Sequence, residues 1–103
     1  MEYQAKLEDK ISMIATASRV LSFHKKFPLA IPEEVFQDVS DFIKYSKNNE
    51  EPTKLLMVAS ASRTMKLIKE NPRLNHRKIL SQVMEELDSI IQEAKTENNE
   101  MIS

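Results

Sequence analysis

The sequence contains no glycine, no cysteine and no tryptophan. Without glycine there is no glycine-rich phosphate loop, no dinucleotide-binding fingerprint and no nucleophile elbow, because each needs a residue without a side chain at a tight turn. Without cysteine there is no disulfide, no thiolate metal site and no cysteine nucleophile. These absences remove most of the short motifs by which an enzyme is identified from its sequence.

Long hydrophobic runs and an excess of one charge are also missing. No stretch approaches the ~20 apolar residues of a membrane span, and the N-terminus lacks the apolar run of a signal peptide. Fifteen basic and sixteen acidic residues give a formal net charge of −1. No global field therefore selects nucleic acid or an anionic membrane, and we expect a cytoplasmic protein with no membrane partner.

The composition is that of one small folded domain. Of the 103 residues, 41% are hydrophobic and 30% are charged, a balance typical of globular proteins. A chain of this length builds one domain around one core, so we expect residues 1–103 to form a single helical domain.

Four prolines divide the chain, because proline lacks a backbone donor and clashes inside a helix. Between the prolines, apolar residues recur at steps of three and four, the spacing of a helix face. The pattern predicts helices over about residues 2–27, 32–47, 52–70 and 75–97, with Asn75 as the N-cap of the last and a frayed end from Asn98. No segment alternates with a period of two for long enough to predict a strand.

Each predicted helix has an apolar face that we expect to be buried. Asp9 lies outside that face of the first helix, and we expect it to be exposed to solvent. The expected inward residues are Leu7, Ile11, Met13, Ile14, Ala17, Ser18, Val20, Leu21, His24 and Phe27 in the first helix, Val35, Phe36, Val39, Phe42 and Ile43 in the second, Leu55, Val58, Ala59, Ser62, Met65 and Ile68 in the third, and Ile79, Leu80, Val83, Leu87, Ile90, Ile91 and Ala94 in the fourth.

An internal repeat is the strongest pattern in the sequence. When residues 10–45 are laid on residues 54–89, nine positions are identical: Lys10, Met13, Ala15, Ala17, Ser18, Arg19, Lys25, Pro28 and Val39 match Lys54, Met57, Ala59, Ala61, Ser62, Arg63, Lys69, Pro72 and Val83. One helical hairpin cannot bury its apolar face alone, so two must pack together. The repeat predicts an all-α, four-helix up-and-down bundle built from two tandem helical hairpins, whose first and third helices approach closely at their small residues.

The residues that could carry catalysis or bind a metal are few. His24 and His76 lie in different segments, and neither has a Glu, Asp or His at ligand spacing on its own helix face. We expect His24 to be partly buried with a satisfied nitrogen and His76 to be a surface residue in a first helical turn. The adjacent carboxylates Glu33 and Glu34 would point ~100° apart on a helix. We therefore predict no enzyme activity, no metal and no cofactor.

One cluster of positive charge surrounds the connection between the third and fourth helices. This basic corner, opposed only by Glu70, consists of Lys66, Lys69, Arg73, His76, Arg77 and Lys78. The helix dipole favours lysines near a helix C-terminus but disfavours Arg77 and Lys78 in a first turn. The cluster is therefore either a solvated surface or a site for phosphate, RNA or an acidic partner. No aromatic residue interleaves these charges to stack on single strands.

Three stretches in the second half of the chain carry a resemblance to a known family: Ala59-Ser60-Ala61, the stretch from Asn71 to Arg77, and Glu86-Leu87-Asp88-Ser89-Ile90. With Ile31-Pro32, which resembles that family's proline at its first turn, they are similar to a family of small uncharacterised archaeal proteins. The resemblance covers about residues 10–91. It implies a bromodomain-like up-and-down bundle of four helices, and it implies no activity.

The sequence favours a noncatalytic helical interaction module whose partner is another protein or a second copy of the chain. The alternative is a nucleic-acid-associated protein that uses the basic corner.

Overall fold

The computed structural model describes residues 7–47 and 50–102, the last six of these as backbone only. These ranges contain no strand and five helices: α1 (Leu7–Lys26), α2 (Pro32–Lys44), α3 (Glu51–Glu70), α4 (His76–Glu85) and α5 (Leu87–Ile102). The prediction of an all-α fold is confirmed. No helix within the described ranges is long and apolar enough to cross a membrane.

The fourth predicted helix is interrupted at Glu86 and becomes α4 and α5. Glu86 has φ −97° and ψ 4°, and its N–H is shared between the carbonyl oxygens of Gln82 (3.1 Å) and Val83 (3.0 Å). Its carboxylate accepts hydrogen bonds from Arg63 of α3 (2.7 Å) and from the Gln82 side chain (2.6 Å). The side chain is thereby tied to α3 at the point where the chain changes direction.

The other helix ends follow the prolines and caps that the sequence indicated. Pro32 begins α2, Pro52 lies in the first turn of α3, and the Asn75 side chain caps α4 by accepting a hydrogen bond from the Lys78 N–H (2.9 Å). The frayed end predicted from Asn98 is wrong, since α5 continues to Ile102. No proline or glycine occurs between residues 87 and 102 to stop it.

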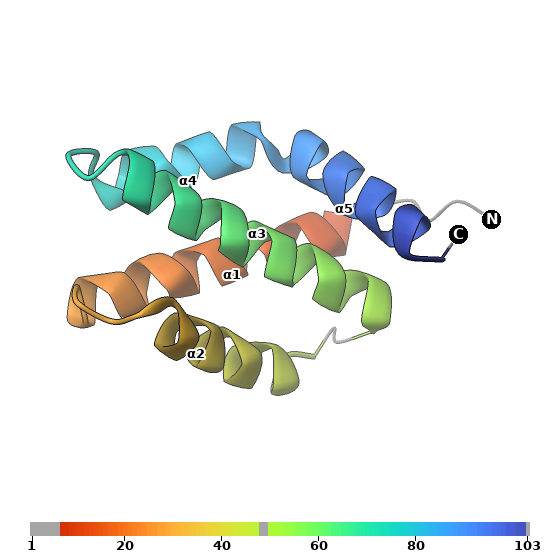
Figure 1. The fold of residues 1–103 in the computed structure, drawn as a ribbon, viewed down its shortest axis with the longest axis horizontal. Helices are drawn as coiled ribbons and strands as arrows, with labels where there is room; N and C mark the ends of the chain where they lie inside the picture. Colours follow the sequence, from red (N-terminus) through yellow and green to blue (C-terminus); the bar gives the residue numbers. More distant parts are fainter. Residues whose placement is uncertain (1–6, 48–49, 103) are drawn as a thin grey trace.

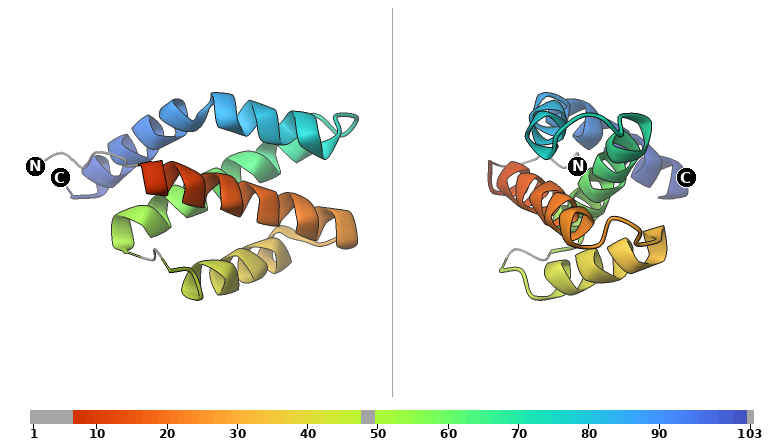
Figure 2. Two further views of the ribbon diagram at one scale, coloured as in Figure 1. Left: turned by 180° about the vertical axis from the view of Figure 1, so that it is seen from behind. Right: turned by 90° about the vertical axis from the view of Figure 1, so that its left-hand side faces the viewer.

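The helices form three layers (Figure 1). α1 and α3 cross in the middle, α2 lies on one side of this pair, and α4 and α5 lie on the other, as the end view in Figure 2 makes clear. Two small cores fill the spaces between layers. The first contains Met13, Ala17, Leu21, Leu56, Leu67, Ile79, Val83, Leu87, Ile90 and Ile91. The second contains Val20, Val35, Val39, Ile43, Met57 and Ala61.

Small residues line the crossing of α1 and α3, as the sequence predicted. Thr16, Ala17, Ser60 and Ala61 are fully buried, and no helix pair in the described chain is packed more extensively than this one. The Ser60 hydroxyl donates a 2.8 Å hydrogen bond across the crossing to the Met13 carbonyl oxygen. Such a bond needs close backbone approach, which only small side chains permit.

The expected buried faces of α2 and α4–α5 are correct, but those of α1 and α3 are partly wrong. Leu7, Ile11, Phe27, Leu55 and Val58 are exposed. The other expected inward residue that lies at the surface is Ser62. α1 and α3 have neighbours on two sides, so their buried surfaces centre on small and hydroxyl residues rather than on one apolar stripe.

Asp9, which the pattern assigned to solvent, is 2% exposed. It faces α3, and the Thr53 hydroxyl donates a 2.8 Å hydrogen bond to its Oδ1. A buried carboxylate needs such a partner because losing its hydration is costly. Periodicity reports only apolar burial, and it therefore misplaced this residue.

Equivalent positions of the predicted hairpins divide between the two cores. Met13 and Ala17 of α1 belong to the core beneath α4 and α5, whereas Met57 and Ala61 of α3 belong to the core above α2. The first helix of each hairpin therefore packs with the second helix of the other hairpin. The two halves interlock rather than stand side by side.

Candidate functional site

The two histidines, which the sequence placed in separate segments, meet at one end of the molecule. His24 Nδ1, in the last turn of α1, lies 3.2 Å from His76 Nε2, at the start of α4. Their rings are tilted by 57° with centroids 5.4 Å apart. Both side chains are half-buried. The expectation for His24 is confirmed, and His76 is less exposed than the surface residue that we expected.

The pKa of His76 lies below its ordinary value of 6.5. Partial burial is the main cause, because it removes water from the charged form. The positive charges of His24 and Lys25 add to the effect by repelling a second proton. A hydrogen bond between the two rings needs one ring nitrogen to donate and the other to accept.

The histidine pair brings the basic corner next to the end of α1. Lys69 lies in the last turn of α3, Arg73 lies in the connection, and Arg77 and Lys78 lie in the first turn of α4, all with exposed side chains. Lys66 is the one residue of the corner with an ion pair in the described structure, a loose 3.9 Å contact with Glu70. Lys25 and Lys26 follow His24 on α1. We call these two lysines and the basic corner together the basic end.

An exposed apolar surface, which the sequence analysis missed, borders the basic end. The connection between α1 and α2 carries Phe27 (54% exposed), Leu29 (95%) and Ile31 (54%), and we call these three side chains the apolar tip. Figure 1 places this connection and the one between α3 and α4 at the same end of the molecule. Phe27 was expected to be buried, but α1 ends at Lys26, so Phe27 leaves the helix before it reaches a core.

The signal for this surface was present in the sequence. Phe27, Leu29 and Ile31 occupy the short connection of residues 27–31, which contains Pro28 and is followed by Pro32. Large apolar residues are unusual in such a connection, since turns favour small and polar residues. Helical periodicity assigned Phe27 to the buried face of the first helix and did not assign Leu29 or Ile31 to a helix face.

Comparison of the chain with protein-family models, curated proteins and solved structures finds no match. Function must therefore be argued from the chain's own surfaces. In the part of the chain that the structure describes, no three His, Cys, Asp or Glu side chains gather where they could hold a metal ion.

A second surface feature lies on α1 and α2, away from the basic end. An open depression of about 260 Å³ is lined by Arg19, Asp41, Phe42, Tyr45 and Ser46. The Arg19 guanidinium makes two 2.8 Å hydrogen bonds with the Asp38 carboxylate and lies 5.9 Å from the centre of the Phe42 ring. This pairing raises the pKa of Arg19. Because its main donors are already used within the fold, the arginine offers little to a ligand.

Proposed function

We propose that the protein is a noncatalytic helical interaction module that binds a protein partner through the apolar tip and the basic end. The observation that carries the proposal is the exposure of three large apolar side chains, Phe27, Leu29 and Ile31, within one connection of five residues. Scattered exposed apolar residues are ordinary, whereas a group of them marks a contact surface.

The energetics favour a buried partner contact at the tip. Covering a large apolar side chain contributes ~1.5–3 kcal/mol to the free energy of binding. Leu29 is 95% exposed, so a partner can cover nearly its whole side chain. The surrounding cations would raise the rate of encounter with an acidic partner and orient it. Binding through the tip therefore combines an apolar anchor with a charged rim.

Affinity capture with matched variants tests this function. The wild-type chain, Leu29→Ser and Tyr45→Ser are tagged and used to capture proteins from the source cell, followed by mass spectrometry. Tyr45 is 80% exposed and ends α2 at the side away from the tip, so its replacement is the control. Proteins retained by wild type and by Tyr45→Ser should be lost with Leu29→Ser. Identical sets for all three proteins would exclude the tip as the binding surface.

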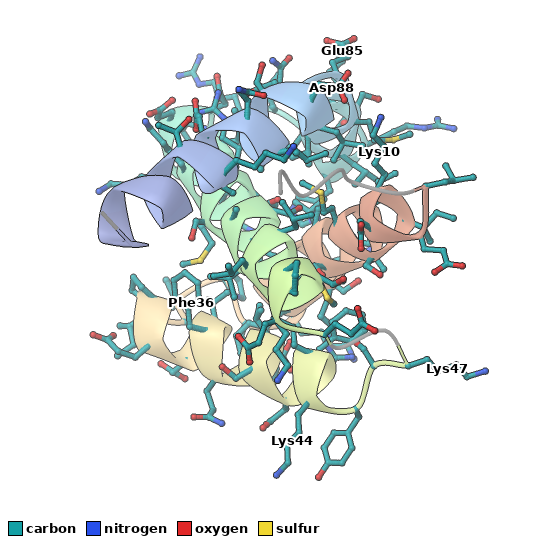
Figure 3. The ribbon with its side chains drawn as sticks, turned by 90° about the vertical axis from the view of Figure 1, so that its right-hand side faces the viewer. Lys10, Phe36, Lys44, Lys47, Glu85 and Asp88 are labelled. Atoms are coloured by element: carbon teal, nitrogen blue, oxygen red, sulfur yellow. The ribbon has the colours of Figure 1, made fainter. Side chains whose placement is uncertain are left out.

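A nucleic-acid-associated function is the second candidate, because nearly all charged residues in and around the basic end are positive. Residues 24–31 and 66–78 hold seven of the fifteen basic residues and a single acidic residue, Glu70. A site of this kind predicts binding that weakens steeply with salt. Replacing Arg73 and Arg77 by Ala should reduce binding to an RNA or DNA oligonucleotide in ~50 mM salt. Lys44→Ala with Lys47→Ala, at the positions marked in Figure 3, is the control pair.

The finer description of the fold is part of the same proposal. We propose that α4 and α5 together act as the fourth helix of an up-and-down bundle, and that the bundle arose by duplication of one hairpin. α3 begins and ends 44 residues after α1, and α4 begins 44 residues after α2, which supports this reading. Membership of the archaeal family and a cytoplasmic location remain proposals that rest on the sequence alone.

A further inference from the structure

Two exposed apolar side chains lie at the opposite end of α1, and a third lies near the end of α4, four residues before Asp88. Leu7 (74% exposed) and Ile11 (57%) are one turn apart on the same helix face, and Met84 (49%) precedes Glu85 at the end of α4. Lys10 shares the face of Leu7 and Ile11, and its ammonium lies 3.1 Å from Asp88 Oδ1. This ion pair joins the N-terminal half of α1 to the start of α5. We call Leu7, Ile11 and Met84 the apolar seam.

The charge around the seam is opposite to the charge around the tip. Asp88 lies beside Lys10 in Figure 3 and Glu85 lies beyond Asp88, and exposed Glu8 follows Leu7 on α1. In the part of the chain that the structure describes, Glu8, Glu85 and Asp88 lie around the seam, and Lys10 pairs with Asp88. At the tip, Lys25, Lys26 and the basic corner supply positive charge. Each surface carries the apolar groups and the charge that would complement the other.

We propose that the apolar tip of one copy of this chain docks on the apolar seam of a second copy. Leu29 and Phe27 pack against Leu7, Ile11 and Met84, while Lys25 and Lys26 face the carboxylates of Glu85 and Asp88. This inference rests on the proposed function in one respect, that the tip is a binding surface, and it names the partner as the same chain.

The geometry makes the contact head-to-tail. The tip follows the last residue of α1 and the seam begins at its first, and a helix of 20 residues is ~30 Å long. The tip therefore cannot reach the seam of its own chain. A head-to-tail contact leaves one free tip and one free seam on every dimer, so copies add in a row until a ring closes or concentration limits growth.

The contact is small, which sets its strength. The two short dimensions of the molecule are 26 and 25 Å. One end of the molecule therefore offers no more surface than the ~800 Å² that each partner contributes to an interface of standard size. We therefore expect weak association that depends on concentration and on salt.

Sedimentation velocity of the purified full chain tests the proposal. The mean mass should rise with concentration in ~50 mM NaCl and fall back toward that of the monomer in ~500 mM NaCl. Leu29→Glu should weaken association at least ~10-fold, and so should Ile11→Glu and Met84→Glu. Tyr45→Glu should associate as wild type does. Circular dichroism establishes that each variant is folded. Two seam variants are used so that the test still stands if one of them does not fold.

Mixing distinguishes this arrangement from a symmetric dimer. Leu29→Glu keeps an intact seam and Ile11→Glu keeps an intact tip, so the two together should form a one-to-one complex that grows no further. The head-to-tail contact is excluded if association persists in Leu29→Glu and in both seam variants. It is also excluded if mixing Leu29→Glu with Ile11→Glu restores no association. A monomer at every concentration also excludes it, while the capture experiment with Leu29→Ser can still succeed and leave the proposed function standing.

Discussion

The Thr53 hydroxyl donates a 2.8 Å hydrogen bond to Oδ1 of Asp9, and the two residues are 44 positions apart. This separation equals the offset at which the two predicted hairpins match. The bond therefore joins the corresponding positions of α1 and α3, and both side chains are buried. Together with the hydrogen bond from Ser60 to the Met13 carbonyl oxygen, this contact fixes how the two central helices are placed along each other.

Removing either partner of this bond should destabilise the fold. Asp9→Ala leaves the Thr53 hydroxyl without its acceptor, and Thr53→Val takes a donor from a buried carboxylate. Each change should lower the free energy of unfolding by ~1–3 kcal/mol, measured by urea denaturation followed by circular dichroism. The double variant should lose less than the sum of the two. Glu8→Ala, which alters an exposed neighbour, should stay within ~0.5 kcal/mol of wild type.

The crossing of α1 and α3 should not tolerate a larger side chain. Ala17 is fully buried there, and Ala17→Leu forces three extra heavy atoms between the helices, at a cost of ~1–3 kcal/mol or more. Ala15→Leu adds the same atoms at an exposed position of the same helix and should leave the melting temperature nearly unchanged. Equal melting temperatures for the two variants would contradict the close packing at Ala17.

The ion pair between Arg63 and Glu86 should stabilise the bend between α4 and α5. The Arg63 Nη2 atom lies 2.7 Å from Glu86 Oε1, and both side chains are partly buried. Glu86→Ala should cost ~1–2 kcal/mol, below the full value for a charged hydrogen bond because water reaches the pair. Glu86→Gln keeps an acceptor and should cost less, and Glu85→Ala is the exposed control. If Glu86→Ala unfolds at the same urea concentration as wild type, the bend does not depend on this pair.

The histidine pair should make stability depend on pH. His76 has a lowered pKa in the fold, so between its ordinary value of 6.5 and the lower folded value the unfolded chain binds more protons. Stability should therefore fall as pH decreases below about 6.5 and level off below the folded pKa. His76→Gln should show a weaker decline between pH 7 and pH 5, and the carboxylates common to both proteins cancel in the comparison.

Nuclear magnetic resonance titration measures the same effect directly. The ring signals of His76 should give a pKa below 6.5, and the value should rise in His24→Gln because the neighbouring positive charge is gone. A His76 pKa at or above 6.5 in the folded wild type would contradict the partial burial of this ring, and an unchanged pKa in His24→Gln would contradict the effect of His24.

The helices and most of their limits could be predicted from the sequence, because proline positions and caps act locally. The buried faces of α2, α4 and α5 could also be predicted, since each has its main neighbours on one side. α1 and α3 differ because neighbours on two sides bury Asp9, Thr16, Ser60 and Thr64. A rule that equates burial with apolar side chains cannot identify such a surface.

The candidate site was predicted only in part. Lys69, Arg73, Arg77 and Lys78 form an exposed cluster because they are close in sequence. The contact between His24 and His76 spans 52 residues, and it exists only because α4 packs beside the end of α1. Local patterns contain no information on such a contact, and the apolar tip was missed because it belongs to no helix.

The interlocking of the two hairpins sets when this chain can fold during synthesis. Met13 and Ala17 share a core with Ile79, Val83 and Ile90, which are synthesised more than 60 residues later. Until those residues emerge from the ribosome, the face of α1 that packs against α4 and α5 has no partner. The first hairpin can therefore complete its packing only after α4 and the start of α5 have been made.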